Sequence, residues 1–270
     1  MKPHRATIIA EYVLGVLLIV FILGPLAWLA IRAFAGLWTF PNLLPTTWTL
    51  RWWGTVFAEP GLVSSIVQSL IIAPVVTLVS AVVCLPAAYA LSRYRFPGRQ
   101  AVLIVIFSTN AFPKFGLFIT MASLFYGMRL MGTFVGVLIV QLIGTIVFMV
   151  WIPAAAFSGV SRDLQDAARD AGAGPFRVFR SITLPLAAPA IFVALILSFL
   201  SAFDEAQGTF LVGAPTYITM PVRMYTLVNN YPPQVAAVFS ILLSIPSVLL
   251  LLSVRKRVLG GAIAEGFSLH

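Results

Sequence analysis

The chain has few residues that could carry out covalent chemistry. It contains one cysteine, Cys84, and this residue lies inside an apolar run, so disulfides and thiolate metal clusters are excluded within the chain. Its two histidines, His4 and His270, lie at the extreme termini, where they are poor candidates for a catalytic or metal site. The G-x-x-x-x-G-K-[ST] phosphate loop is also missing. We therefore expect no catalytic residue, metal or cofactor in this chain.

Charge is equally scarce. Only 9% of the residues are charged, whereas 60% are hydrophobic and the mean hydropathy is +1.02. These values lie outside the range of soluble domains. The net charge of +9 could suggest nucleic acid, but the basic residues stand at the ends of apolar runs. That placement is typical of orientation in a membrane and argues against a nucleic-acid partner.

The apolar runs predict an all-α membrane protein with a single domain over 1–270. A transmembrane helix needs about 20 apolar residues. The first run is longer than the core of a secretory signal, so we expect it to stay as a span, with cleavage after Ala33-Phe34-Ala35 as a minor alternative. The six predicted spans cover about 8–34, 62–92, 101–125, 133–157, 184–204 and 234–254, and a polar loop covers 158–185.

The positions of lysine and arginine predict the orientation. Twelve of the 17 lie at the amino terminus, in the turn at 93–99, in the loop at 158–185 or in the carboxyl tail. With six spans, all four of these segments fall on the same side of the membrane. Cytoplasmic loops carry the excess of positive charge, so we place this side, with both termini, in the cytoplasm.

The polar stretch 161–185 reads S-R-D-L-Q-D-A-A-R-D-A-G-A-G-P-F-R-V-F-R-S-I-T-L-P. It is too polar to lie in hydrocarbon, so it forms a loop or a short helix at a membrane face. An aspartate near its start and Gly172 as a helix end predict a short helix over 163–171, with Arg169 and Asp170 at its rim. Small apolar side chains would form one face, where another protein could dock: Leu164, Ala167, Ala168 and Ala171.

Within this stretch Asp166-Ala167-Ala168, Gly172 and Ile182-x-Leu184-Pro185 keep a fixed spacing. The spacing resembles the cytoplasmic loop signature of permease subunits of type I ATP-binding cassette importers, the binding-protein-dependent transport inner-membrane family. Asp166 stands where that family usually has Glu. A solvated connector without a partner is the alternative. The resemblance implies a coupling helix between spans 4 and 5, with these coupling residues: Asp163, Leu164, Asp166, Ala167, Ala168, Asp170, Gly172, Ile182, Leu184 and Pro185.

The resemblance covers most of the chain and implies the partners of the protein. These are a second homologous permease subunit, two ATPase subunits that bind ATP and Mg, a periplasmic or lipid-anchored solute-binding protein, and membrane lipid. The location would be the bacterial cytoplasmic (inner) membrane, and the mechanism alternating access. A channel and a membrane-embedded enzyme are remote alternatives. The former needs a repeated polar filter and the latter an intramembrane His/Asp/Glu or Ser/His cluster, and the sequence has neither.

Polar residues inside the spans are candidates for the solute path. Lys114 lies near the middle of the third span, where an ammonium costs about 2.5–3.5 kcal/mol. Asn110 lies one turn earlier on the same face. Lys114 either lines the path or pairs with an acid such as Asp204 or Glu205. These two adjacent acids point in different directions, so they do not chelate one charge together, and at least one is expected to be structural. Gln141 in the fourth span is a weaker candidate.

The nature of the solute follows from two observations that point in different directions. The S-A-F-D-E run at 201–205 and the following F-L-V-G-A-P resemble the polyamine, opine and phosphonate permeases. A path selective for cations would not contain an unpaired Lys114. We therefore favour a neutral or anionic solute such as a sugar derivative, with a polyamine or opine-type cation as the alternative.

Overall fold

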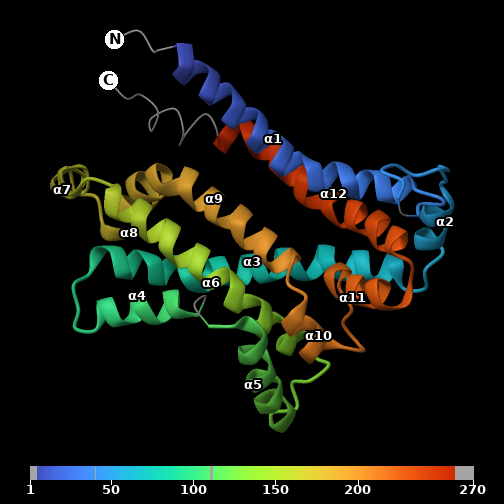
Figure 1. Ribbon diagram of the computed structural model, residues 1–270. Coiled ribbons are helices and arrows are strands. Elements are labelled where there is room, and N and C mark those ends of the chain that lie inside the picture. The colour runs from blue at the N-terminus through green and yellow to red at the C-terminus, as the bar shows by residue number, and fades with distance from the viewer. Residues whose placement is uncertain (1–4, 40, 110–111, 259–270) are drawn as a thin grey trace. The chain divides into compact units, whose positions relative to one another are not determined.

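The computed structural model describes residues 5–39, 41–109 and 112–258 (Figure 1). Over these ranges the chain is helical, and its only strand-like pairing is an isolated bridge between Ala35 and Trp48. In chain order the elements are α1 (Arg5–Phe34), α2 (Arg51–Phe57), α3 (Leu62–Arg93), α4 (Arg99–Ser108), α5 (Lys114–Gly127), α6 (Phe134–Gly159), α7 (Arg162–Asp170), α8 (Pro175–Val178), the π-helical turn η1 (Phe179–Thr183), α9 (Leu184–Phe203), α10 (Gln207–Gly213), α11 (Met220–Asn230) and α12 (Pro233–Val258).

Two compact units make up the chain. Unit 1 comprises Met1–Leu62 and Met224–Pro246, and unit 2 comprises Val63–Arg223 and Ser247–His270. The chain passes between them at the start of α3 and again inside α11 and α12. The single domain over 1–270 stays a prediction.

Five segments in the described part of the chain are long and apolar enough to cross a membrane. They are Glu11–Phe34, Leu62–Arg93, Phe134–Gly159, Pro175–Phe203 and Pro233–Val254. All-helical architecture is thus confirmed, and these segments coincide with five of the six predicted spans. The count of six spans and the cytoplasmic termini stay predictions.

The third predicted span, 101–125, is formed by two shorter helices. α4 has ten residues and therefore a length of about 15 Å, half of a hydrocarbon core. Pro113 caps α5 with an extended ψ of 110°. Proline has no N–H to donate and disfavours helix in the residue before it, so one continuous helix does not form here.

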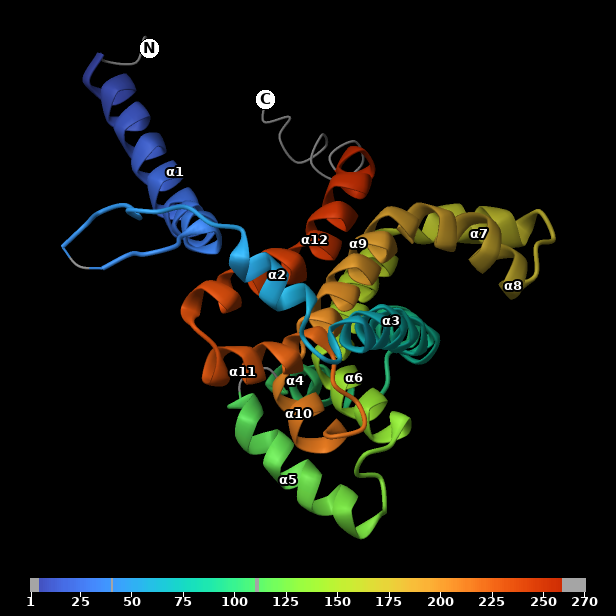
Figure 2. The same cartoon turned by 90° about the vertical axis from the view of Figure 1, so that its right-hand side faces the viewer.

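The core of unit 2 lies between α3, α6 and α9, and of these α6 and α9 run side by side (Figures 1 and 2). A further cluster joins α5, α6 and α10. A polar contact also links two of the long helices: the Thr145 hydroxyl on α6 donates to Ser80 Oγ on α3 at 3.0 Å. The central buried side chains are Cys84, Met149 and Ala194 in one cluster, Ala88, Phe157 and Ile191 in the second, and Phe118, Phe125, Val140 and Val212 in the third.

Unit 1 contains the most exposed long helix. The apolar window of Glu11–Phe34 is 0% buried inside the chain, and large side chains such as Phe21 are 79% exposed. In water an apolar surface of this size would promote association, so it fits contact with lipid or another subunit. After α1 the chain turns back on itself, and the Trp52 indole N–H donates to Ala35 O at 2.7 Å.

Candidate functional site

The short helix predicted over 163–171 is α7 (Arg162–Asp170), and both of its ends are capped. At the start, the Ser161 hydroxyl accepts a hydrogen bond from the Asp163 N–H at 3.1 Å, and the Asp163 charge favours the first turn. At the end, Gly172 has a φ of +85°. Its N–H donates to Arg169 O, while Ala173 N–H donates to Ala168 O. This is a Schellman motif, which needs a left-handed residue and explains the glycine.

The small apolar face of α7 is largely exposed. Leu164 is 54% exposed, Ala167 is exposed and Ala168 is half-buried. Gln165, on the other face, is the buried residue of the helix. The small apolar face predicted from the sequence is therefore not covered by unit 2 itself. Such a face can dock in a groove of another protein.

A buried hydrogen bond ties α7 to the long helix α9. The Gln165 amide donates to Thr183 Oγ1 at 2.9 Å, and both side chains are buried. Thr183 ends the π-helical turn η1, and Leu184 directly after it begins α9. Pro185 is the second residue of α9, directly after the π-helical turn. Ile182 and Leu184 are half-buried beside this link.

The link was missed in the sequence, because it joins residues that are 18 positions apart. Gln165 is the only amide side chain of the stretch, which is a weak signal. The turn η1 that carries Thr183 has no recognisable sequence pattern, although π-helical turns are frequent at functional sites.

The two acids at the centre and end of α7 lie on its surface. Asp166 forms an ion pair with Arg169 at 2.7 Å, and both side chains are more than half exposed. Asp170 is also exposed. Because i and i+3 residues share a helix face, Asp166 and Arg169 lie with Arg162 and Gln165 rather than with the small apolar side chains.

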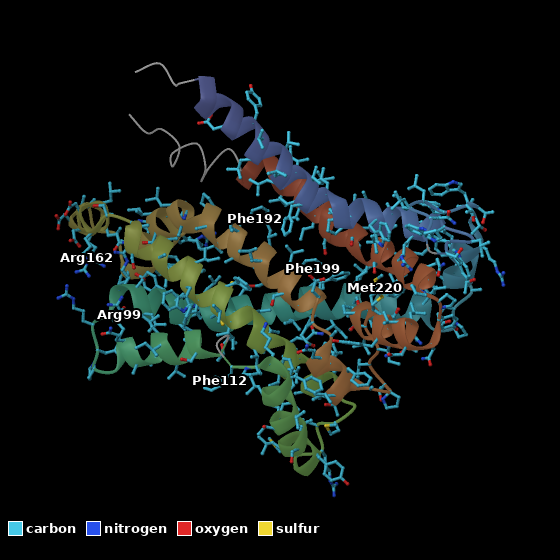
Figure 3. The ribbon with its side chains drawn as sticks, in the orientation of Figure 1. Arg99, Phe112, Arg162, Phe192, Phe199 and Met220 are labelled. Carbon is cyan, nitrogen blue, oxygen red and sulfur yellow. The ribbon has the colours of Figure 1, made fainter. Side chains whose placement is uncertain are left out.

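The candidate solute residues are only partly brought together. Asn110 lies outside the described residues. Lys114 is the first residue of α5 and is exposed, close to the break where Figure 3 shows Phe112. Among the described residues there is no ion pair between Lys114 and Asp204 or Glu205, which was one of the two alternatives. Asp204 caps the end of α9 and is exposed.

Glu205 has a structural role. Its carboxylate accepts hydrogen bonds from Gly208 N–H at 2.7 Å, from Thr209 N–H at 2.9 Å and from the Thr209 hydroxyl at 2.6 Å. Two of these donors are free backbone N–H groups at the start of α10, and the third is the side-chain hydroxyl of Thr209. A carboxylate that accepts three hydrogen bonds within the chain has its acceptor atoms already satisfied. A contact of Glu205 with solute stays a prediction.

Gln141 extends this polar contact into the protein. It is 1% exposed, and its amide donates to Thr209 Oγ1 at 2.9 Å. Its Oε1 is buried without a hydrogen-bond partner among the described residues. In this conformation Gln141 does not face an open path, so its predicted contact with solute also stays a prediction.

Close packing holds α10 against α6 and α5. A Cβ at Gly208 would overlap the Val140 side chain and would lie 3.0 Å from Phe118. Only glycine lets α10 come this close to these two side chains. The contacts of Gly208 with Val140 and of Thr209 with Gln141 were missed, because these partners lie on helices that are distant in the sequence.

Comparisons with known proteins agree with this architecture. Residues 80–259 match the family described as "Binding-protein-dependent transport system inner membrane component". The chain is 30% identical over 249 residues to the maltodextrin transport system permease protein MdxG of Bacillus subtilis, covering 86% of this chain and 82% of that protein. It is 28% identical over 206 residues to the spermidine/putrescine transport system permease protein PotC of Escherichia coli K12, covering 76% and 78%.

A solved structure supports the fold. A subunit of a bacterial ABC transporter involved in the import of the acidic polysaccharide alginate superimposes with a TM-score of 0.69 at 21% identity. The match covers 95% of this chain and 99% of that subunit. The overall helical fold of this chain therefore resembles one known from experiment.

Proposed function

The chain belongs to the binding-protein-dependent transport inner-membrane family, the membrane permease subunits of ATP-binding cassette importers, and from this premise we propose that α7 docks on a separate ATP-hydrolysing subunit. The observation that carries the proposal is the uncovered small apolar face of α7, capped at both ends. A helix with a free apolar face and well-formed caps is suited to a groove in another protein.

The complex would contain a second homologous permease, two ATPase subunits and an extracytoplasmic solute-binding protein. ATP and Mg would be bound by the ATPase subunits, since the sequence has no phosphate loop. Movement of a docked α7 would be passed through the Gln165–Thr183 bond to the start of α9. A rigid element tied at one point to a long helix is suited to alternating access.

The coupling role is tested with a charge on the docking face. Ala167→Asp would bury an unpaired carboxylate in the groove, so we expect solute uptake to be lost and ATPase subunits to dissociate from the purified permease. Gly174→Asp is the matched control. It adds the same charge to the same loop at the exposed N-cap of α8, where Asp is favourable. Normal uptake by Ala167→Asp would contradict the coupling role.

For the solute, we propose a neutral or anionic compound such as a sugar derivative. Lys114 is exposed and not paired with Asp204 or Glu205, and it stands beside the free N–H groups that begin α5. Positive charge from both sources favours oxygen-rich or anionic groups. The similarity to a maltodextrin permease supports a sugar. A polyamine is the second candidate, supported by the similarity to PotC and by the exposed Asp204.

The two solutes are distinguished by uptake into vesicles that contain the complete complex with its own binding protein. With maltodextrin as the probe, Lys114→Met should lower uptake about tenfold or more, because a charge-assisted hydrogen bond contributes about 1.5–3 kcal/mol. Lys114→Arg keeps the charge and should retain most uptake. Near-normal uptake by Lys114→Met, together with uptake of spermidine, would favour the polyamine.

A further inference from the structure

A positively charged pocket lies where the last turn of α3 meets α7. Its volume is about 220 Å³, which is several times the ~30 Å³ that one water occupies in the liquid. Arg93 and Tyr89 line it from α3, and Arg162, Asp166 and Arg169 line it from α7. Figure 3 shows Arg162 at the same end of unit 2 as Arg99, which follows α3. The Arg99 Nε donates to Leu91 O at 2.6 Å and so marks the end of that helix.

The charges that line the pocket do not balance. It contains three guanidinium groups and one carboxylate, and this carboxylate, of Asp166, is already paired with Arg169. Arg93 donates through Nη2 to Val160 O at 2.9 Å, but its Nε is buried without a hydrogen-bond partner among the described residues. Arg93 and Arg162 therefore have no acid partner among the residues that line the pocket, and the buried Arg93 donor without an acceptor is costly.

An oxyanion with several acceptor atoms fits these groups. The guanidinium fork matches phosphate in geometry, and Arg–phosphate contacts are frequently bidentate. The pocket lies at the end of a membrane-spanning helix, and Tyr94 on its rim is 62% exposed. Tyrosines gather at the level of lipid headgroups, and basic pockets at the cytoplasmic ends of spans bind anionic headgroups.

We propose that this pocket binds a phosphate group through Arg93 and Arg162, and that the bound phosphate ties α7 to the end of α3. The phosphate has two possible sources, the headgroup of an anionic phospholipid and a soluble phosphate compound. Any effect of the bound phosphate on transport rests on the proposed function, in which α7 docks on the ATPase. Binding itself does not depend on that function.

The test uses the purified complex and two probes, phosphatidylglycerol and inorganic phosphate. Binding of each is measured by native mass spectrometry and by titration for wild type, Arg162→Gln and Arg180→Gln. Arg180 is an exposed arginine of the same loop that does not line the pocket, so it controls for net charge. We expect Arg162→Gln to weaken binding about fivefold and Arg180→Gln to leave it nearly unchanged.

Each outcome decides the proposal. A loss of phosphatidylglycerol binding specific to Arg162→Gln identifies a lipid headgroup, and a specific loss of inorganic phosphate binding identifies a soluble source. Equal binding by wild type and Arg162→Gln, or equal weakening by both variants, overturns the site. Unchanged binding of both probes with loss of the ATPase subunit from Arg162→Gln also overturns it, because the pocket would then belong to the protein interface. Uptake by the Ala167→Asp variant tests the proposed function separately.

Discussion

Two of the short helices in unit 2, α7 and α10, are held in opposite ways. α7 is attached through its caps and one buried hydrogen bond, and its small apolar face is uncovered. α10 lies directly on α6 and α5, with Gly208 against Val140. A short helix between long apolar helices can therefore pack on a partner protein or on its own chain. Apolar side chains that stay exposed, as in α7, indicate the first case.

The acids of these helices differ in the same way. Asp166 forms an exposed ion pair, which contributes about 0.3–0.5 kcal/mol in a helix. Glu205 accepts three hydrogen bonds at a partly buried helix start, where a bond to a charged group contributes about 1.5–3 kcal/mol. The two carboxylates thus contribute unequally to stability, because they differ in exposure and in the number of hydrogen-bond donors that they meet.

The first prediction asks whether the two regions face opposite sides of the membrane. Thr216, in the loop after α10, and Gly174, in the loop after α7, are both exposed. In intact cells a cysteine at Thr216 should react fully with an impermeant thiol reagent, and a cysteine at Gly174 should not react. Cys84 is buried, so wild type gives the background. The reverse labelling pattern would contradict the predicted orientation.

The second prediction concerns the packing of α10. Gly208→Ala should lower the stability of the complex by about 1–3 kcal/mol, because the added methyl overlaps Val140 and Phe118. Gly116→Ala is the matched control, since a Cβ there meets nothing within 4 Å and alanine favours helix by about 1 kcal/mol. Thermal denaturation of the detergent-purified complex measures both. Equal midpoints would show that α10 is not held by this contact.

The third prediction tests the single link of α7. Gln165→Leu should cost about 1–3 kcal/mol, because it leaves the Thr183 hydroxyl buried without its partner. Gln165→Leu with Thr183→Val removes both partners and should recover most of this stability. Uptake should stay low in both variants, since the link itself is absent. Normal uptake by the double variant would show that coupling takes another route.

The smallest effects are expected for the adjacent acids at the end of α9. Glu205→Gln should lower stability by about 1–2 kcal/mol, because an amide has one acceptor oxygen for three donors. The Asp204 side chain is exposed, so Asp204→Asn should change stability by no more than about 0.5 kcal/mol. Thermal midpoints rank the two, and uptake by the stable Asp204→Asn variant then tests solute contact. A larger stability loss for Asp204→Asn would reverse the assigned roles.

Local patterns account for the features that were predicted correctly. Gly172 as the end of α7 follows from a conformation that its own backbone requires, whatever surrounds it. The break between α4 and α5 also has a local cause, since Pro113 acts on its immediate neighbours, but a single span over 101–125 was predicted there. The capping by Glu205 had a local signal too, since its donors lie three and four residues ahead, but the acid was first considered for solute or Lys114.

Hydropathy, motif spacing and cap residues were enough to predict the helical membrane architecture, the family and the capped helix α7, because these signals are local or follow the chain. The side chains that meet across helices became known from the folded structure alone. Gln165 bonds Thr183 at the end of η1, and Gly208 contacts Val140 because α10 lies on α6. The arginine pocket likewise exists only where the end of α3 and the polar face of α7 come together. Such contacts depend on how helices pack, which no periodicity within one helix specifies.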